Sequence, residues 1–303
     1  MAPAAADLKA AVYRGLVVFA PIPILAAIVL ATLYVIGVAR VRRTGRPWPV
    51  LRLLSFLAVG IPLLLFATCG PPAYYAHTSF LWYMTMIVTL ALVTPIFLVW
   101  GGPVTLGRQA LPRSAARWWS AWWDSRLVAF ITYPLVGPLL LLAAPVAVVF
   151  TPLLLASLQH AAVLAAVQLG LVIVGVLATL PLSESESPKH KMPHAVSAFL
   201  AFFELIVDAI PGIVLAYTTT LVASGWYAVN GIPGGTQWAA SDQRWAGQVL
   251  WIAGEIVDLP FLLLIVGRWM RADAEDARRI DAELDARDAR IAAAKASSAD
   301  QTT

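Results

Sequence analysis

Long apolar stretches alternate with short polar or charged segments along most of the chain. Each stretch is close to, or longer than, the ~20 residues with which an α-helix crosses the hydrocarbon core of a bilayer. Because backbone polar groups in hydrocarbon must hydrogen-bond internally, we expect these stretches to be helices. The pattern predicts about seven membrane spans, with approximate bounds at residues 13–39, 52–69, 79–100, 127–150, 153–182, 195–222 and 245–267. The expected fold is therefore all-α, a polytopic membrane helical bundle.

The pattern changes after Arg268, where charged residues of both signs replace the apolar stretches. Ile280, Leu284 and Ile291 recur there at helix-like spacing, which predicts a helix that emerges from the membrane. We therefore divide the chain into a seven-span membrane domain, residues 1–268, and a cytoplasmic charged helix with a frayed tail, residues 269–303. The charged helix is either simply solvated or a docking surface for another protein.

Composition favours a membrane protein over a soluble one. Hydrophobic residues make up 60% of the 303 residues and charged residues only 13%, whereas soluble domains carry about 25% charged residues. The net charge of +4 arises mostly from arginines in the loops. Because this placement is typical of membrane orientation, it gives no indication of nucleic-acid binding, and the lipid bilayer is the expected partner.

The orientation in the membrane follows from the loops that carry positive charge. Arginines gather in the first loop (residues 40–52) and the third loop (108–126), and the fifth loop holds Lys189 and Lys191. Cytoplasmic loops are enriched in Lys and Arg, so these odd-numbered loops are expected in the cytoplasm. The N-terminus is then outside, the C-terminus is cytoplasmic, and the protein is a multi-pass protein of the cell (plasma) membrane.

A tryptophan-rich segment, residues 117–123, lies in the third loop. On a helix, Trp118 and Trp122 share one face because they are four residues apart, and so do Trp119 and Trp123. Tryptophan favours the level of the lipid headgroups, so this segment predicts an interfacial helix. We favour a plain membrane anchor over a binding role for it.

Four carboxylates lie inside the predicted sixth and seventh spans, namely Glu204, Asp208, Glu255 and Asp258. At about 1.5 Å per residue, Glu204 and Asp258 lie about 15 Å from the cytoplasmic end, and Asp208 and Glu255 about 20 Å. An acid at such depth costs at least ~2.5–3.5 kcal/mol. The acids therefore predict a functional cluster: a proton relay, a cation site or a polar groove facing a partner. The structural alternative is a set of hydrogen bonds that holds the helices together.

Three residues near the predicted outer face carry donors that suit copper. Cys69 ends the second span, His77 precedes the third, and His160 lies near the start of the fifth. Together they predict a metal site that is open to the exterior. Taken separately, they are a small buried thiol, a polar loop histidine and a histidine in helix packing. Copper is the one cofactor that the sequence suggests.

Common catalytic signatures are missing from the sequence. We find no Gly-x-Ser-x-Gly, no His-Glu-x-x-His and no phosphate-binding Gly-x-x-x-x-Gly-Lys. No predicted span contains a lysine, so the Schiff base of a retinal protein has no attachment site. We therefore expect a protein that is not an enzyme.

Several short stretches, in order and spacing, carry a resemblance to a known family. They read RRTGRPWP (42–49), ATCG (67–70), YAHT (75–78), GPVTL (102–106), DQ (242–243) with Gly247, WIAGE (251–255), RAD (271–273) and RRID (278–281). On these stretches the chain resembles the CtaG family of cytochrome c oxidase assembly factors over about residues 35–290. The resemblance implies a seven-span membrane protein implicated in copper supply to the oxidase.

The resemblance also implies histidines that this chain lacks. The family pattern has His-Met-x-Gln-His in the third span, where this chain reads YMTMI (83–87), and further histidines near Gln168, Gly170 and Asp208. Of the plausible polar positions, only His77, Cys69 and Glu255 remain, so the chain is identified as a divergent member.

The leading hypothesis is a membrane assembly factor for a respiratory cytochrome c oxidase, aiding copper delivery and contacting oxidase subunits or other assembly factors. The alternative is a proton-coupled transporter or ion-binding membrane protein that uses the intramembrane carboxylates.

Overall fold

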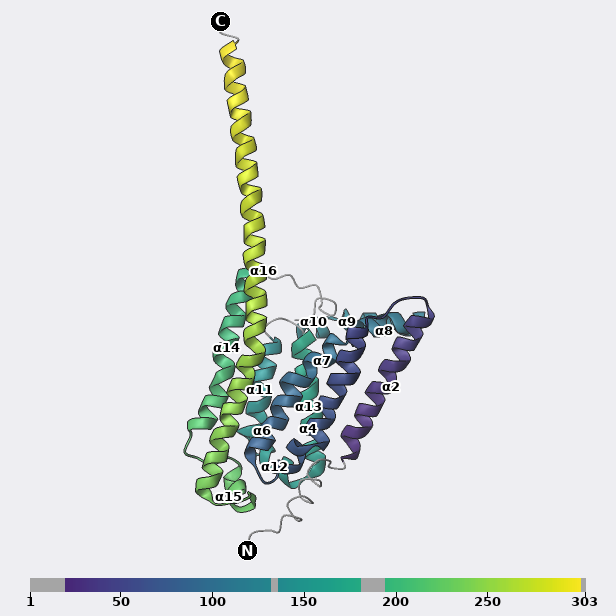
Figure 1. The fold of residues 1–303 in the computed structure, drawn as a ribbon, viewed down its shortest axis with the longest axis vertical. Coiled ribbons are helices and arrows are strands. Elements are labelled where there is room, and N and C mark those ends of the chain that lie inside the picture. The colour runs from purple at the N-terminus through teal and green to yellow at the C-terminus, as the bar shows by residue number, and fades with distance from the viewer. Residues whose placement is uncertain (1–19, 132–135, 181–193, 301–303) are drawn as a thin grey trace.

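The computed structural model describes residues 20–131, 136–180 and 194–300, and the ordered elements in these ranges are all helical (Figure 1). The first half contains α2 (Pro21–Arg43), α3 (Val50–Leu54), η1 (Ser55–Gly60), α4 (Ile61–Cys69), α5 (Pro71–Tyr75), α6 (Phe80–Val88), η2 (Thr89–Val93), α7 (Thr94–Trp100), α8 (Pro103–Ala110), α9 (Arg113–Trp123) and α10 (Arg126–Ile131). The second half contains α11 (Val136–Val149), α12 (Leu153–Gln159), α13 (Ala161–Thr179), α14 (His194–Tyr217), η4 (Ala223–Gly225), α15 (Trp226–Asn230) and α16 (Thr236–Asp300). The predicted all-α fold is confirmed.

Several of these helices are long and apolar enough to cross a membrane. In the described ranges there are four such segments, Pro21–Arg43, Val50–Tyr75, Phe80–Ala110 and Ala161–Thr179. The pair Leu139–Val149 and Leu153–Gln159 makes a fifth crossing if it counts as one broken span, bent by 62°. In α14 the apolar stretch Leu205–Tyr217 is shorter than a span. The described residues thus contain four or five candidate spans by length and composition, and the predicted seven are not confirmed.

The predicted single span over residues 153–182 is wrong, because the chain breaks at His160. This residue has extended backbone angles, φ −129° and ψ 113°, and separates α12 from α13. The short helix α12 instead pairs with α11 across the bend near Pro152. The fifth predicted span therefore corresponds to α13 alone.

Two π-helical segments interrupt the second and third predicted spans, and each ends two residues before a proline. η1 precedes Pro62 and η2 precedes Pro95. Proline has no amide hydrogen, so it cannot bond the carbonyl four residues earlier, which widens the helix locally. The Ala91 carbonyl lies against α13 at Gly175, where an added Cβ would approach it within 2.2 Å. Helix α13 can therefore pack this closely only with a glycine there.

Helix α6 lies at the centre of the bundle. Its side chains Phe80, Tyr83, Met84, Met86 and Ile87 are each at most 1% exposed and join the main hydrophobic core. Most other helices present one apolar face to this core and one outward, as expected for a bundle surrounded by lipid. The central helix is therefore the element against which the candidate site residues are positioned.

Helices α14 and α16 pack side by side in an antiparallel pair (Figure 1). A Cβ added at Gly212 would lie 2.8 Å from the Gly247 carbonyl, and one at Gly247 would lie 2.5 Å from the Ala216 amide nitrogen. Small residues allow two membrane helices to approach closely. These contacts set the antiparallel register that the depths of the acids predict.

Helix α16 is continuous for 65 residues and projects far beyond the bundle (Figure 1). The expected domain boundary at residue 268 therefore falls inside one helix. Ile280 and Leu284 on the projecting part are 52% and 50% exposed. The tail that we expected to fray is helical to Asp300, and residues 301–303 lie outside the described ranges.

Candidate functional site

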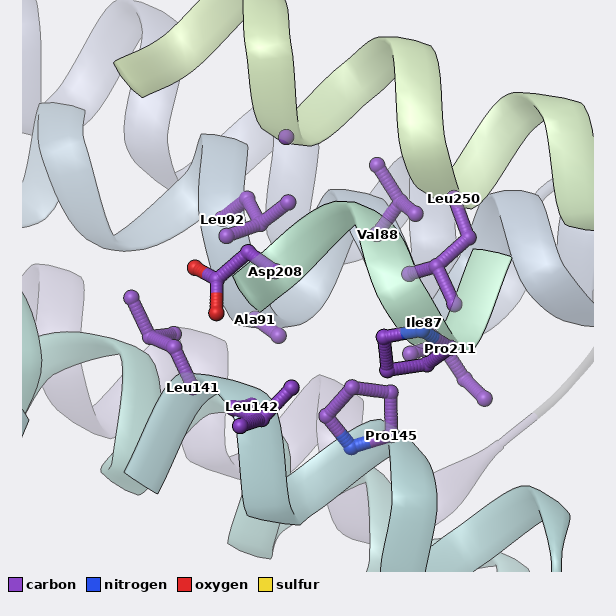
Figure 2. A pocket seen from close by; sticks show the side chains of 11 residues that line it. Ile87, Val88, Ala91, Leu92, Leu141, Leu142, Pro145, Asp208, Pro211 and Leu250 are labelled. Carbon is purple, nitrogen blue, oxygen red and sulfur yellow. The ribbon is translucent and has the colours of Figure 1, made fainter. Parts of the chain in front are cut away.

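Asp208 lines a small cavity in the interior of the bundle (Figure 2). The cavity measures about 30 Å³, which is room for one or two water molecules. Its walls come from the central helix α6 with η2, from α11, and from the α14–α16 pair. Figure 2 shows the Asp208 carboxylate among apolar side chains, in the neighbourhood of Leu92 and Leu141. The carboxylate is therefore a polar group in largely apolar surroundings.

Two prolines line the same cavity, Pro145 within α11 and Pro211 within α14. A proline inside a helix cannot donate to the carbonyl four residues earlier. The carbonyls concerned are those of Leu141 and Val207, next to or within the cavity lining. An acid, a water-sized space and two released carbonyls can together hold water or a proton inside an apolar bundle.

Glu255 lies one residue beyond Gly254, which lines the cavity from α16. Its Oε1 accepts a hydrogen bond from Trp251 Nε1 at 3.2 Å, one helical turn away. Trp251 packs against Gly212, so this bond is made close to the α14–α16 contact. Glu255 is only half-buried, and the hydrogen bond from the indole N–H offsets part of the cost of removing its carboxyl group from water.

The structure describes the side chains of only two of the four predicted acids, Asp208 and Glu255. Asp208 and the Gly254–Glu255 segment meet across the α14–α16 pair, as the depth argument requires. Glu204 and Asp258 lie in the same two helices, but their side chains are outside the described part of the structure. The functional role of the four acids thus stays a prediction.

Buried polar contacts occupy the positions where the family resemblance implies histidines. Tyr83 and Ser157 share a hydrogen bond of 2.7 Å between their hydroxyl oxygens. Gln168 Nε2 donates to the Met86 sulfur at 3.3 Å. These two contacts join the central helix α6 to α12 and α13. The chain therefore fills this region with neutral hydrogen-bonded pairs. Their phenol, hydroxyl and amide groups are poor ligands for copper, whereas the Met86 thioether suits copper(I) and accepts a hydrogen bond from Gln168.

The three predicted metal ligands are not gathered into a site. Cys69 is buried at the end of α4, near the Thr68 hydroxyl at 3.6 Å. His77 follows α5 and contributes its backbone carbonyl, which accepts from Trp226 Nε1 at 3.0 Å. His160 is exposed between α12 and α13. Among the described residues no group of three His, Cys, Asp or Glu side chains is placed to hold a metal ion, so copper binding by Cys69, His77 and His160 stays a prediction.

Sequence reasoning missed the cluster around Asp242, which is only 8% exposed. Its carboxylate accepts from Ser79 Oγ at 2.9 Å and from the backbone N–H groups of Phe80 and Leu81 at 2.5 and 3.4 Å. Burial raises the pKa of this carboxyl, and the three hydrogen bonds offset part of that rise. Asp242 thereby caps the first turn of the central helix α6 from a distant part of the chain.

Gln243 extends this cluster to the segment between α14 and α15. Its side chain accepts from the Val222 amide at 2.9 Å and donates to the Thr220 carbonyl at 3.0 Å. Ser79 at the start of a predicted helix is a recognisable N-cap signal. The partner carboxylate is 163 residues away from Ser79, so no local pattern could have identified it.

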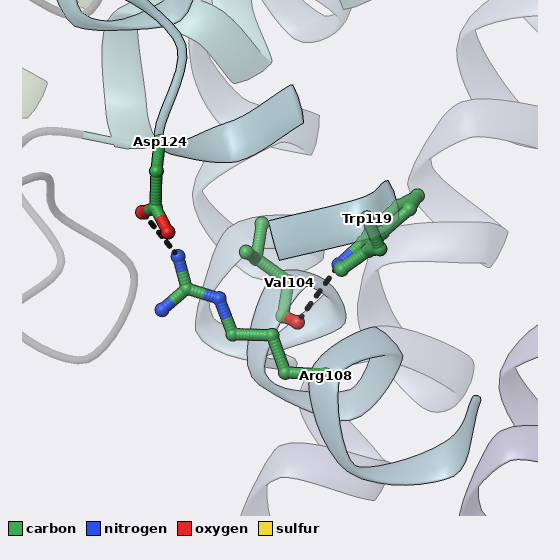
Figure 3. A network of polar contacts seen from close by, with 4 residues as sticks. All are labelled: Val104, Arg108, Trp119 and Asp124. Atoms are coloured by element: carbon green, nitrogen blue, oxygen red, sulfur yellow. Dashed lines mark hydrogen bonds and ion pairs between the residues drawn. The ribbon is translucent and has the colours of Figure 1, made fainter. Parts of the chain in front are cut away.

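The opposite end of the bundle carries the arginines and the tryptophan-rich helix α9. As expected, Trp118 and Trp122 stack with ring centroids 6.4 Å apart, and Trp119 and Trp123 form the other pair at 5.8 Å. Trp119 Nε1 donates to the Val104 carbonyl of α8 at 3.3 Å (Figure 3). Arg108 of α8 pairs with Asp124, just after α9, at 3.3 Å (Figure 3). These contacts join α8 and α9 into one unit.

Comparison with known proteins identifies a family and relatives that are similar to this chain. The model of the family described as "Cytochrome c oxidase caa3 assembly factor (Caa3_CtaG)" matches residues 32–272. Uncharacterized proteins of Mycobacterium leprae and Mycobacterium bovis are each 29% identical to the chain, over 269 and 270 residues respectively. Each of these matches covers 86% of this chain and 40% of the relative, so the chain spans about two fifths of the relatives' length. No solved structure matches the chain significantly.

Proposed function

This chain belongs to the cytochrome c oxidase caa3 assembly factor (CtaG) family, and from that premise we propose that it assists the assembly of a respiratory cytochrome c oxidase. The observation that carries the proposal is the family match over residues 32–272, which takes in the central helix, the Asp208 cavity and the Asp242 cluster. The role proposed is a non-catalytic one, in which the chain contacts oxidase subunits or other assembly factors within the membrane.

We further propose that α14 and the corresponding part of α16 complete a seven-span arrangement. Residues 13–39 are the first of these spans and contain most of α2. The segregation of arginines to one end of the bundle supports a cytoplasmic location for that end. In this arrangement the N-terminus is outside and the projecting part of α16 is cytoplasmic, and the protein resides in the plasma membrane.

Copper delivery receives no support from the residues that are described. Cys69, His77 and His160 do not form a ligand set, and the Met86–Gln168 and Tyr83–Ser157 pairs already satisfy one another. We therefore derive no step of the assembly function through copper. The transporter alternative likewise gains no specific support, because a water-sized cavity at Asp208 serves a structural role equally well.

The proposal is tested by deleting the gene for this protein in its host and measuring cytochrome c oxidase activity in isolated membranes. We expect oxidase activity to fall severalfold, while another membrane enzyme such as succinate dehydrogenase keeps its activity. Expression of the wild-type chain in the deletion strain is the control and should restore the oxidase. Unchanged oxidase activity, during both copper-limited and copper-replete growth, would refute the proposed assembly role.

A further inference from the structure

Helix α9 has two faces with different surroundings. Trp119 and Trp123 face the protein: an added Cβ at Gly107 would come within 2.6 Å of the Trp119 ring, and Trp123 packs against a small core that includes Val99 and Val104. Trp118 and Trp122 point away from the bundle and are 70% and 48% exposed. The helix is therefore docked through one tryptophan pair and presents the other pair outward.

Two exposed arginines flank the outward indoles along the chain. Arg117 directly precedes Trp118 in α9, and Arg126 begins α10, four residues after Trp122. Residues 101–131 contain four arginines and one acid, a net charge of +3. That one acid, Asp124, pairs with Arg108, so Arg117 and Arg126 are not neutralised by it.

The location of this face matches its chemistry. Helices α8 and α9 lie across the end of the bundle where α2 ends in Arg40, Arg42 and Arg43 (Figure 1). In water, two exposed indoles would form an unfavourable apolar patch. At the level of the lipid headgroups, the apolar part of each ring contacts hydrocarbon while its N–H group contacts polar headgroups or water. Adjacent arginines are complementary to headgroups that carry negative charge.

We propose that Arg117, Trp118, Trp122 and Arg126 form a binding surface for anionic phospholipid headgroups. The indoles insert at the headgroup level, and the two guanidinium groups attract phosphate-bearing lipids with net negative charge in preference to zwitterionic ones. The proposal rests on the chain spanning a bilayer, as proposed above, and is independent of the role in oxidase assembly.

The test uses the full-length protein in lipid nanodiscs made of equal parts phosphatidylcholine and phosphatidylglycerol. Bromine atoms, which quench tryptophan fluorescence on contact, are placed either on the phosphatidylcholine or on the phosphatidylglycerol. The fluorescence of the outward pair is obtained by subtracting the tryptophan fluorescence of the Trp118→Phe/Trp122→Phe variant from that of the wild type. We expect this signal to be quenched severalfold more by brominated phosphatidylglycerol than by brominated phosphatidylcholine.

Arg117→Gln/Arg126→Gln should bring the two quenching efficiencies close to equality, because each arginine near an anionic surface strengthens attraction about fivefold. Arg244→Gln, an exposed arginine at the opposite end of the bundle, is the matched control and should leave the preference unchanged. Equal quenching of the wild type by the two lipids would overturn the proposal, as would a preference that survives loss of both arginines. Absence of quenching of the outward pair by both brominated lipids would also overturn it, and would indicate a protein as the occupant of this face.

Discussion

A single carboxylate, Asp242, joins two segments that are 162 residues apart by accepting from the first amides of α6. The first amides of a helix have no partner within that helix, so another group must satisfy them when they are buried. Ser79 supplies its own hydroxyl as a cap and also donates to Asp242. The position of the central helix thus depends on a residue at the start of α16.

Asp242→Ala is expected to destabilise the protein by about 1–3 kcal/mol, the cost of leaving buried donors without an acceptor. Asp242→Asn should cost less, because its amide oxygen can still accept one of the three bonds. The measurement is the thermal unfolding midpoint in a single detergent. Arg244→Ala, two residues along the same helix but exposed, is the control; if it lowered the midpoint as much as Asp242→Ala, the cap would not explain the loss.

The acids inside the bundle make a second prediction at this scale. We expect Asp208→Asn and Glu255→Gln to lower oxidase activity severalfold, and Glu204→Gln and Asp258→Asn to have smaller effects. Asp208 lines the cavity and Glu255 bonds Trp251, and both are predicted to lie nearer the outer face than the other two acids. The assay is oxidase activity in a deletion strain that expresses each variant, normalised to the amount of variant protein in the membrane.

The amide variants separate a functional site from structural hydrogen bonding. A neutral amide can keep a hydrogen bond and removes a charge that is costly to desolvate, so a purely structural acid should tolerate the change. Full activity at normal abundance in both Asp208→Asn and Glu255→Gln would eliminate the functional site. Loss of activity at normal abundance would support it.

At the scale of elements, the α14–α16 pair is a close helix packing that depends on glycines. At Gly247 a methyl group would meet the backbone of α14 at 2.5 and 2.6 Å. Backbone atoms cannot move aside as the end of a flexible side chain can, so the helices would have to separate. The cavity at Asp208 is lined by both helices, and its shape depends on their spacing.

Gly247→Ala is therefore expected to cost about 1–3 kcal/mol, as for overpacking of a well-packed interior. Gly267→Ala in the same helix has open space around the added methyl group, and alanine favours a helix over glycine by up to about 1 kcal/mol. It should leave the unfolding midpoint unchanged or raise it. Equal effects of the two substitutions on the midpoint would show that the α14–α16 contact is not the cause.

Periodicity and length were sufficient to predict the apolar helices and the paired tryptophans of α9. They could not predict the break at His160, because residues 153–169 contain no glycine or proline that would indicate the end of a helix. The depth estimate predicted that Asp208 would lie inside the bundle, where it lines the cavity. Nothing in the sequence predicted that Asp242 caps α6. Contacts between distant segments depend on the whole packing arrangement, which a single sequence does not display.

At the scale of the whole molecule, the two ends of the bundle differ in chemistry. One end carries the arginines, α9 and the departure point of the projecting α16 helix (Figure 1). The other end carries the Asp242 cluster and the short helices α12 and α15 (Figure 1). If the positive-inside rule applies, the first end is cytoplasmic and all its features face the same compartment.

Topology reporters provide the test of this orientation. A reporter inserted after Ser185 or fused to the C-terminus should be cytoplasmic, and one inserted near Gly234 should be external. The reason is that several basic loops agree on one side, and translocating even one of them costs free energy for each arginine that must cross. Alkaline phosphatase, active only outside, and green fluorescent protein, fluorescent only inside, are fused at each position and serve as controls for one another.

Because α16 connects the Gly234 region to the C-terminus as one helix, the reporters at these two positions must lie on opposite sides if α16 crosses the bilayer. A C-terminal reporter on the outside would contradict the proposed orientation, and reporters on the same side would contradict a spanning α16.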